Sequence, residues 1–182
     1  MENIDDTKAG VTEFPGLTTE RLVLRQLQDS DAFTISKLRS DDAVNAYIDR
    51  PKQTSLEGAS AFITKINGNI REGKCFYWAI CLKGNPDLIG TACLFNFSTD
   101  KATAELGYEL SPEFQGQGIT NEAVRQVIAF AFHTTGFCGL EACVHRDHVK
   151  SINLLLKNNF IPDLAKKEEK LPDYNFFVLA AS

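Results

Sequence analysis

The sequence of 182 residues lacks a long apolar run. Its first six residues include three acidic side chains, and no apolar stretch follows them. A secretory signal needs a basic start and an apolar run of about 7 to 15 residues. Residues 123–132 are rich in apolar side chains, but Arg125 and Gln126 interrupt them, and a membrane helix needs roughly 18 continuous apolar residues. We therefore expect a cytoplasmic protein with no membrane partner.

The sequence also lacks paired cysteines. None of its five cysteines forms a Cys-x-x-Cys pair, the spacing typical of redox and zinc sites. Four of them lie in strand-like apolar runs, where a reduced thiol behaves as a small hydrophobe, so buried structural thiols are expected (Cys75, Cys81, Cys93 and Cys143, with Cys138 the fifth). His145 and His148 have no third ligand at metal-site spacing, and we expect no metal.

Positive charge is in short supply. The chain has 19 lysines and arginines against 24 acidic residues, a net charge of −5. A nucleic-acid partner is therefore not expected, and the balance mildly favours cationic substrates.

The composition is that of a globular protein, and the length fits one domain, with residues 1–16 as a tail and residues 17–182 as the domain. Alternating or β-rich runs predict strands, and helical spacing with capping signals, such as Thr54-x-x-Glu57 before a helix that ends at Gly73, predicts helices. A strand, a helix and a strand at residues 106–145 form a βαβ unit, whose two strands should be parallel. The order predicts an α/β or α+β fold with a mixed sheet: strands at residues 21–27, 75–82, 88–97, 102–110, 140–145 and 175–180, and helices at 32–38, 54–73, 121–135 and 150–158.

A glycine-rich turn between the strand at 102–110 and the next helix is the most informative segment. It reads Gln115-Gly116-Gln117-Gly118. Glycines there can turn successive N–H groups inward, and the positive end of the helix dipole lies behind them, so the turn suits a pyrophosphate. The alternative is an ordinary turn. The segment matches neither a Walker A loop nor a Gly-x-Gly-x-x-Gly fingerprint.

Gln115-x-x-Gly118-x-Thr120 resembles the Gln/Arg-x-x-Gly-x-Gly/Ala pyrophosphate motif of the GNAT N-acetyltransferase superfamily. The rest of the chain is similar to the RimJ/RimL-like branch of that superfamily at residues 19–25, 88–90, 104–110, 121–123 and 151–160. The resemblance implies the GNAT fold, a mixed and mostly antiparallel central sheet with a splayed parallel strand pair and helices on both faces.

The resemblance also implies acetyl-CoA as cosubstrate. Backbone groups near Leu110 would pair with the pantetheine, and the other cofactor-binding residues would be Gln115, Gly116, Gln117, Gly118, Ile119, Thr120 and His148. Three positions depart from the family pattern. Thr120 replaces Gly or Ala and can cap the helix or contact a phosphate; His148 replaces the usual Asn; and Asn159, which tolerates left-handed angles, replaces Gly.

Two residues are candidates for the chemistry of acetyl transfer. Ser151 occupies the family position beside the cofactor sulfur and would protonate the thiolate; the alternative is that it caps the last helix. Glu105 would accept the proton of the amine; the alternative is a solvated or ion-paired strand residue. Tyr108 either lines the same cleft or belongs to the core.

The expected reaction is direct transfer of an acetyl group to a primary amine without a covalent enzyme intermediate, since no Ser or Cys lies in a nucleophile-base arrangement. The resemblance favours a protein N-terminus, for example of a ribosomal protein, as acceptor. A small amine (polyamine, amino-acid derivative or aminoglycoside) or a non-catalytic acyl-CoA sensor are the alternatives. We expect a monomer or homodimer.

Overall fold

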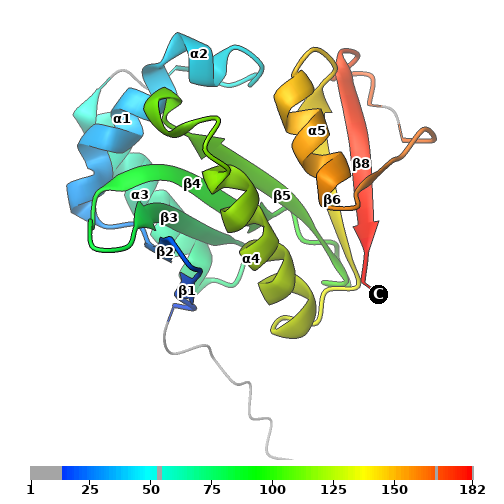
Figure 1. The fold of residues 1–182 in the computed structure, drawn as a ribbon, viewed down its shortest axis with the longest axis horizontal. Coiled ribbons are helices and arrows are strands. Elements are labelled where there is room, and N and C mark those ends of the chain that lie inside the picture. The colour runs from blue at the N-terminus through cyan, green and yellow to red at the C-terminus, as the bar shows by residue number, and fades with distance from the viewer. Residues whose placement is uncertain (1–13, 53–54, 167, 182) are drawn as a thin grey trace, which may run out of the picture.

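The computed structural model describes residues 14–52, 55–166 and 168–181 (Figure 1). Residues 1–13 of the expected tail lie outside this part. Phe14 packs on Trp78 with ring centroids 6.0 Å apart, and Pro15 O accepts a hydrogen bond from Trp78 Nε1 at 2.8 Å. The polypeptide therefore contacts the core from Phe14 onward.

The described strands form one mixed sheet in the order β1-β2-β3-β4-β5-β6-β8-β7. Their bounds are β1 Leu17–Thr18, β2 Leu22–Gln26, β3 Phe76–Leu82, β4 Leu88–Phe95, β5 Thr103–Leu110, β6 Gly139–His145, β7 Ile161–Pro162 and β8 Tyr174–Ala180. Each pair of neighbours is antiparallel except β5 and β6, as the βαβ unit predicts.

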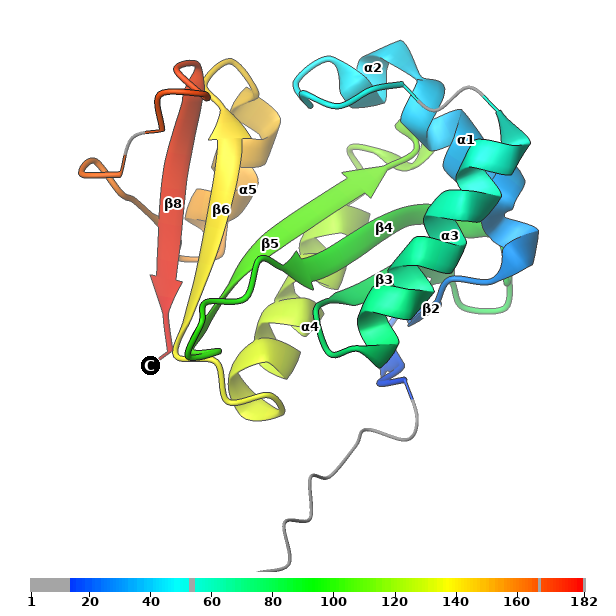
Figure 2. The same ribbon diagram turned by 180° about the vertical axis from the view of Figure 1, so that it is seen from behind.

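The parallel pair is joined at one end only. β5 and β6 pair at Thr103 with Gly139, Ala104 with Leu140 and Glu105 with Glu141. Beyond Glu105 the two strands diverge, which opens the sheet into a V (Figures 1 and 2). The splayed parallel pair of the sequence prediction is confirmed.

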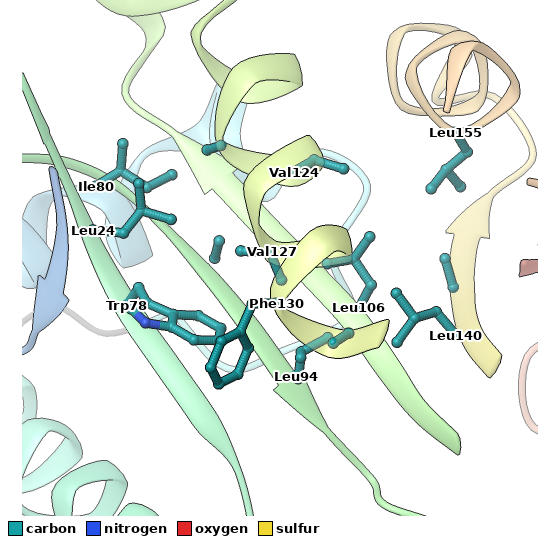
Figure 3. Close-up of a cluster of buried hydrophobic side chains, with 14 of the residues drawn as sticks. Leu24, Trp78, Ile80, Leu94, Leu106, Val124, Val127, Phe130, Leu140 and Leu155 are labelled. Carbon is teal, nitrogen blue, oxygen red and sulfur yellow. The ribbon is translucent and has the colours of Figure 1, made fainter. Parts of the chain in front are cut away.

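Helices cover both faces of the sheet, also as predicted (Figures 1 and 2). The face of α4 and α5 carries the larger core, in which Trp78 meets Phe130 edge-on at 5.3 Å (Figure 3). The opposite face packs against α1 and α3 through Ile35, Leu38 and Ile63. The bounds are η1 Asp29–Asp31, α1 Ala32–Ser40, α2 Asp42–Asn45, α3 Leu56–Arg71, η2 Pro112–Phe114, α4 Ile119–His133 and α5 Val149–Lys157.

The helix-capping prediction at Thr54 needs a correction, and the first helix carries no side-chain cap. Thr54 lies outside the described residues, and Ser55 is the N-cap of α3, with its side chain accepting from Gly58 N. Asp31 is the N-cap of α1 but makes no capping bond, because its carboxylate pairs with Arg25 at 2.8 Å. The sequence did not predict β1, β7 or α2, whose two to four residues are too short for a periodicity to show.

Gly90 on β4 lies where two strands approach closely, and this gives the first testable prediction. A Cβ there would come within 2.5 Å of Glu109 O and 2.7 Å of Leu110 Cδ1. We expect Gly90→Ala to lower the free energy of unfolding by about 1–3 kcal/mol, the usual cost of overpacking, in a denaturant titration. Gly68→Ala in α3 is the matched control: its Cβ meets nothing within 4 Å, so it should stabilise by up to about 1 kcal/mol. Equal effects would show that the approach at Gly90 is not tight.

Candidate active site

The divergence of β5 from β6 opens into a cavity of about 1730 Å³. Its walls come from β5, β6, the glycine-rich turn, the start of α4, α5 and the segment around α2. Nine of the ten residues predicted for the site line it: Glu105, Leu110, Gln115, Gly116, Gly118, Ile119, Thr120, His148 and Ser151. Gln117 points elsewhere, since its Nε2 donates to Glu113 O at 3.0 Å. The fold therefore brings together residues spread over nearly 50 positions of the sequence.

The turn between β5 and α4 owes its shape to two glycines. Gly116 and Gly118 have φ of 75° and 77°, left-handed angles that other residues rarely adopt. Gly118 is the N-cap of α4, so Thr120 is the second residue of the helix and the prediction that it could cap the helix is wrong. The Gln115 side chain donates to Leu110 O at 3.0 Å and ties the turn to the end of β5. Free amides at a helix N-terminus are suited to an anionic ligand.

A side-chain clamp holds this helix start to the N-terminal strands. Glu122 accepts hydrogen bonds from Thr19 Oγ1 at 2.5 Å and from Arg21 N at 2.9 Å, and pairs with Arg21 Nε at 2.6 Å. Arg21 Nη1 also donates to Gln117 O at 3.1 Å. Two of the motifs that carried the family resemblance, residues 19–25 and 121–123, therefore meet behind the glycine turn.

The clamp predicts a pH dependence of stability. Burial raises the pKa of Glu122, but bonds from Thr19 and Arg21 outweigh it, so the net pKa is lowered. A lowered pKa stabilises the fold above the ordinary value of about 4.3, and that contribution is lost as pH falls through the lowered value. Since Arg21 is 47% exposed, Glu122→Gln should lower the free energy of unfolding by only about 1 kcal/mol at pH 7, and wild type and variant should converge in acid.

The control for this measurement is Glu113→Gln. Glu113 lies 3.9 Å from Lys37, and both side chains are more than half exposed. We expect no measurable change in stability at either pH. A loss for Glu122→Gln that persisted unchanged at pH 3 would contradict the charge argument.

Ser151 and Tyr108 meet across the open strand pair. Ser151 is the third residue of α5, whose N-cap is His148, so the alternative that Ser151 caps this helix is wrong. Its hydroxyl shares a hydrogen bond of 2.7 Å with the Tyr108 hydroxyl from β5, and Ser151 is only 6% exposed. Burial raises the pKa of Tyr108 to about 12, against a smaller opposing effect of Ser151. Tyr108 packs on the core and also lines the cavity, so both sequence interpretations hold.

His148 lies at the mouth of the cavity beside α2. Its ring packs on Tyr47 with centroids 4.7 Å apart, and Tyr47 also packs on His145 at 5.5 Å. Burial, with Lys150 and His145 nearby, lowers the pKa of His148, so the imidazole is neutral at pH 7. The segment after α2 thus reaches across to β6 and β8, where Tyr174 OH donates to Tyr47 O at 3.3 Å.

Two carboxylates on β5 face the side of α1 and α3. Glu105 lies at the closed end of the V, where Asn96 Nδ2 donates to it at 2.8 Å and where burial raises its pKa. Glu109 is 8% exposed and pairs with Arg50 at 2.5 Å. Neither Glu109 nor Arg50 was predicted from the sequence as a site residue. The period-two spacing of Glu105 and Glu109 on one strand was a signal that both share a face.

The cysteines only partly follow the prediction. Cys75 and Cys81 are buried, but Cys138 is exposed, and Cys93 and Cys143 are partly exposed and line the cavity. Cys143 lies on β6 beyond the point where that strand parts from β5, which the strand pattern could not show. In the described part of the chain, no three His, Cys, Asp or Glu side chains gather as a metal site would require. In the same part, none of the helices has the length and apolar character to cross a bilayer.

An open parallel strand pair beside a glycine-rich helix start defines the class: an acetyl-CoA-dependent N-acetyltransferase. The chain belongs to the acetyltransferase (GNAT) domain family, whose sequence pattern matches residues 21–161. The uncharacterized N-acetyltransferase YoaA of Bacillus subtilis (strain 168) is 32% identical over 163 residues, 90% of this chain and 89% of that protein.

Relatives also lie in the RimJ/RimL branch, as the sequence resemblance predicted. The ribosomal protein uS5-alanine N-acetyltransferase of Escherichia coli (strain K12) is 26% identical over 166 residues, 87% of this chain and 81% of that protein. The structure of RimL, a ribosomal L7/L12 alpha-N-protein acetyltransferase in complex with coenzyme A, superposes with a TM-score of 0.78 at 18% identity, covering 91% of this chain and 98% of that one. At this identity the structural likeness shows a shared fold and does not indicate a shared substrate.

Proposed function

We propose that this enzyme transfers the acetyl group of acetyl-CoA directly to the α-amine of a protein N-terminus, such as that of a ribosomal protein. The observation that carries the reaction is the Ser151–Tyr108 hydrogen bond of 2.7 Å, which lies in the same cavity as the glycine turn. The relative that acetylates uS5 supports the acceptor class.

The residues of the turn are suited to the cosubstrate. The backbone amides from Gln115 to Thr120 would hold the pyrophosphate at the positive end of α4, with Gly116 and Gly118 leaving room for it. Backbone groups near Leu110 would pair with the pantetheine in the V, and His148 would border it at the mouth. When bound, acetyl-CoA supplies the activated acetyl group.

Each proton of the reaction has a candidate residue. The amine must be neutral to attack the thioester carbonyl, and Glu105 accepts its proton directly or through water, helped by a raised pKa. Ser151 donates a proton to the thiolate as the C–S bond breaks and regains one from the Tyr108 hydroxyl, to which it is hydrogen-bonded. Glu105 releases the amine proton to solvent, and solvent reprotonates Tyr108. A free α-amine, with a pKa of about 8, is partly neutral at physiological pH, whereas lysine at about 10.4 is almost fully protonated. An α-amine therefore demands less of Glu105.

Thiol release from acetyl-CoA across matched acceptors tests this function. The panel contains peptides with a free N-terminus and an internal lysine, the same peptides with a blocked N-terminus, a polyamine and an aminoglycoside. We expect turnover of the free peptides only, with the acetyl group located on the α-amine by mass spectrometry. Turnover of the small amines alone would replace the acceptor class, and CoA binding without any turnover would favour the sensor.

A further inference from the structure

The cavity continues to the face of α1 and α3, where it meets a buried polar network. Glu109 accepts from Arg50 Nη2 at 2.5 Å and from Thr91 Oγ1 at 3.3 Å, and Tyr77 OH donates to Thr91 Oγ1 at 3.1 Å. Tyr77 and Thr91 lie on neighbouring strands and line the cavity. The Glu109 carboxylate is therefore paired with the Arg50 guanidinium and hydrogen-bonded by the Thr91 hydroxyl.

A second guanidinium at this end of the cavity has no such match. Arg39 projects from α1 over the Phe62 ring, with Cζ 4.2 Å from its centroid. Its Nε is buried without a hydrogen-bond partner, and no ion pair joins Arg39 to another described residue. Burial lowers the pKa of Arg39, and Arg50 lowers it further against the opposing effect of Glu109. A partly desolvated cation with unused donors is costly unless an anion meets it.

The local charge of this region is opposite to that of the whole chain. Arg39 and Arg50 lie near Glu109, and Lys65 of α3 lines the same cavity, although the net charge of the protein is −5. The field on a ligand in this region depends on these nearest groups more than on the net charge of the chain.

Arg39 lies on the acceptor side of the cavity rather than the cofactor side. Successive side chains of a strand point to opposite faces, and on β5 Tyr108 turns to the face of Ser151 and α5 while Glu109 turns to the face of α1 and α3. The glycine turn and Ser151 are on the first face. An amine that approaches the V from the second face passes Arg39.

We propose that Arg39 binds a carboxylate of the acceptor, so that the enzyme selects primary amines that carry an anionic oxygen group a few bonds from the amine. This inference rests on the proposed acetyl transfer to an amine. The planar guanidinium, held on Phe62, presents a fork of donors that matches the two oxygens of a carboxylate. The Arg50–Glu109 pair next to it keeps that fork from folding back onto Glu109, since Glu109 already has its partners.

The test compares acceptors that differ only in charge. The pairs are peptides that begin Ala-Glu or Ala-Gln, and the dipeptide Ala-Ala with a free or an amidated carboxyl group; a peptide that begins Ala-phosphoserine distinguishes phosphate from carboxylate. We expect kcat/KM to be at least about tenfold higher for an acidic member of a pair, the scale of one charge-assisted hydrogen bond. A preference within the Ala-Glu and Ala-Gln pair would indicate recognition of a peptide side chain. A preference within the Ala-Ala pair would indicate recognition of the carboxyl group of a small amino compound.

Arg39→Gln should abolish the preference and leave the rate on the neutral acceptor and the affinity for CoA unchanged. Lys37→Gln is the matched control, because it removes a positive charge from the same helix at a side chain that is 65% exposed. It should keep the preference. Equal rates of wild type on acidic and neutral acceptors would overturn the inference while leaving the acetyl transfer intact, and a loss of CoA affinity in Arg39→Gln would assign Arg39 to the cofactor.

Binding of the acetylated products tests the Arg39 subsite even if the enzyme does not transfer acetyl groups to any of these acceptors. If no acceptor is turned over, calorimetry with N-acetyl-Ala-Glu and N-acetyl-Ala-Gln in the presence of CoA still measures the subsite. Tighter binding of the acidic product, lost in Arg39→Gln, supports the inference without turnover. Equal binding of the two products overturns it.

Discussion

Gly118→Val is expected to lower the affinity for CoA by roughly 100-fold or more, the loss of about 3 kcal/mol of charge-assisted hydrogen bonds. Gly118 has φ of 77° and is the N-cap of α4. Valine is strained at this angle, and its Cβ would lie 3.6 Å from Arg21 Nη2, so the backbone amides at the start of α4 that a pyrophosphate needs would be displaced. Calorimetric titration with CoA measures the effect.

Gly136→Val separates lost binding from strain. Gly136 has φ of 75°, nearly the angle of Gly118, and a Cβ there meets nothing within 4 Å. It lies just after the C-terminal end of α4, whereas the glycine turn precedes the N-terminal end of that helix. Both variants should lose a similar amount of stability, about 1–2 kcal/mol, but Gly136→Val should bind CoA as the wild type does. Unchanged CoA affinity in Gly118→Val would remove the turn from the cofactor site.

Ser151→Ala is expected to lower kcat by about 100-fold, the lower end of what a positioned proton donor contributes, with little change in KM for acetyl-CoA. The Ser151 hydroxyl is buried and held by its hydrogen bond to Tyr108, so its removal takes away a positioned donor. Steady-state thiol release, with saturating acetyl-CoA and a peptide acceptor, measures the change.

Tyr108→Phe is the matched variant, because it breaks the same 2.7 Å hydrogen bond and leaves the serine hydroxyl in place. We expect a loss in kcat of less than about tenfold, which corresponds to one neutral hydrogen bond. If Tyr108→Phe cost more than Ser151→Ala, the tyrosine and not the serine would be the proton donor. Equal losses would indicate that the pair only positions the cofactor.

The glycine turn could be predicted from the sequence because its shape depends on local order, and the family because motifs between residues 19 and 160 resemble its pattern. A strand, a Gln-x-x-Gly turn and a helix follow one another within 30 residues, and the short-range geometry of glycine sets the shape of the turn. The rule for βαβ units also predicted that β5 and β6 are parallel, and their pairing confirms it.

The residues proposed for acceptor binding could not be predicted from local order in the sequence. Arg39, Arg50 and Glu109 come from α1, the segment after α2 and β5, up to 70 positions apart. Nothing local distinguishes them from the solvated charges that surround them in the sequence. The net charge pointed to a cationic substrate, which these residues do not favour.

The sequence by itself indicated the fold family, through motifs spread along the chain. It also determined the parallel β5–β6 pair and the glycine-rich turn, since these two follow from neighbouring residues. Only the tertiary structure decided that β5 and β6 part after Glu105 and that Ser151 meets Tyr108 across the opening. It also decided that Arg39, near an Arg50–Glu109 pair, has no ion-pair partner among the described residues. The physical reason is that burial and pairing of a charge depend on which distant elements pack around it.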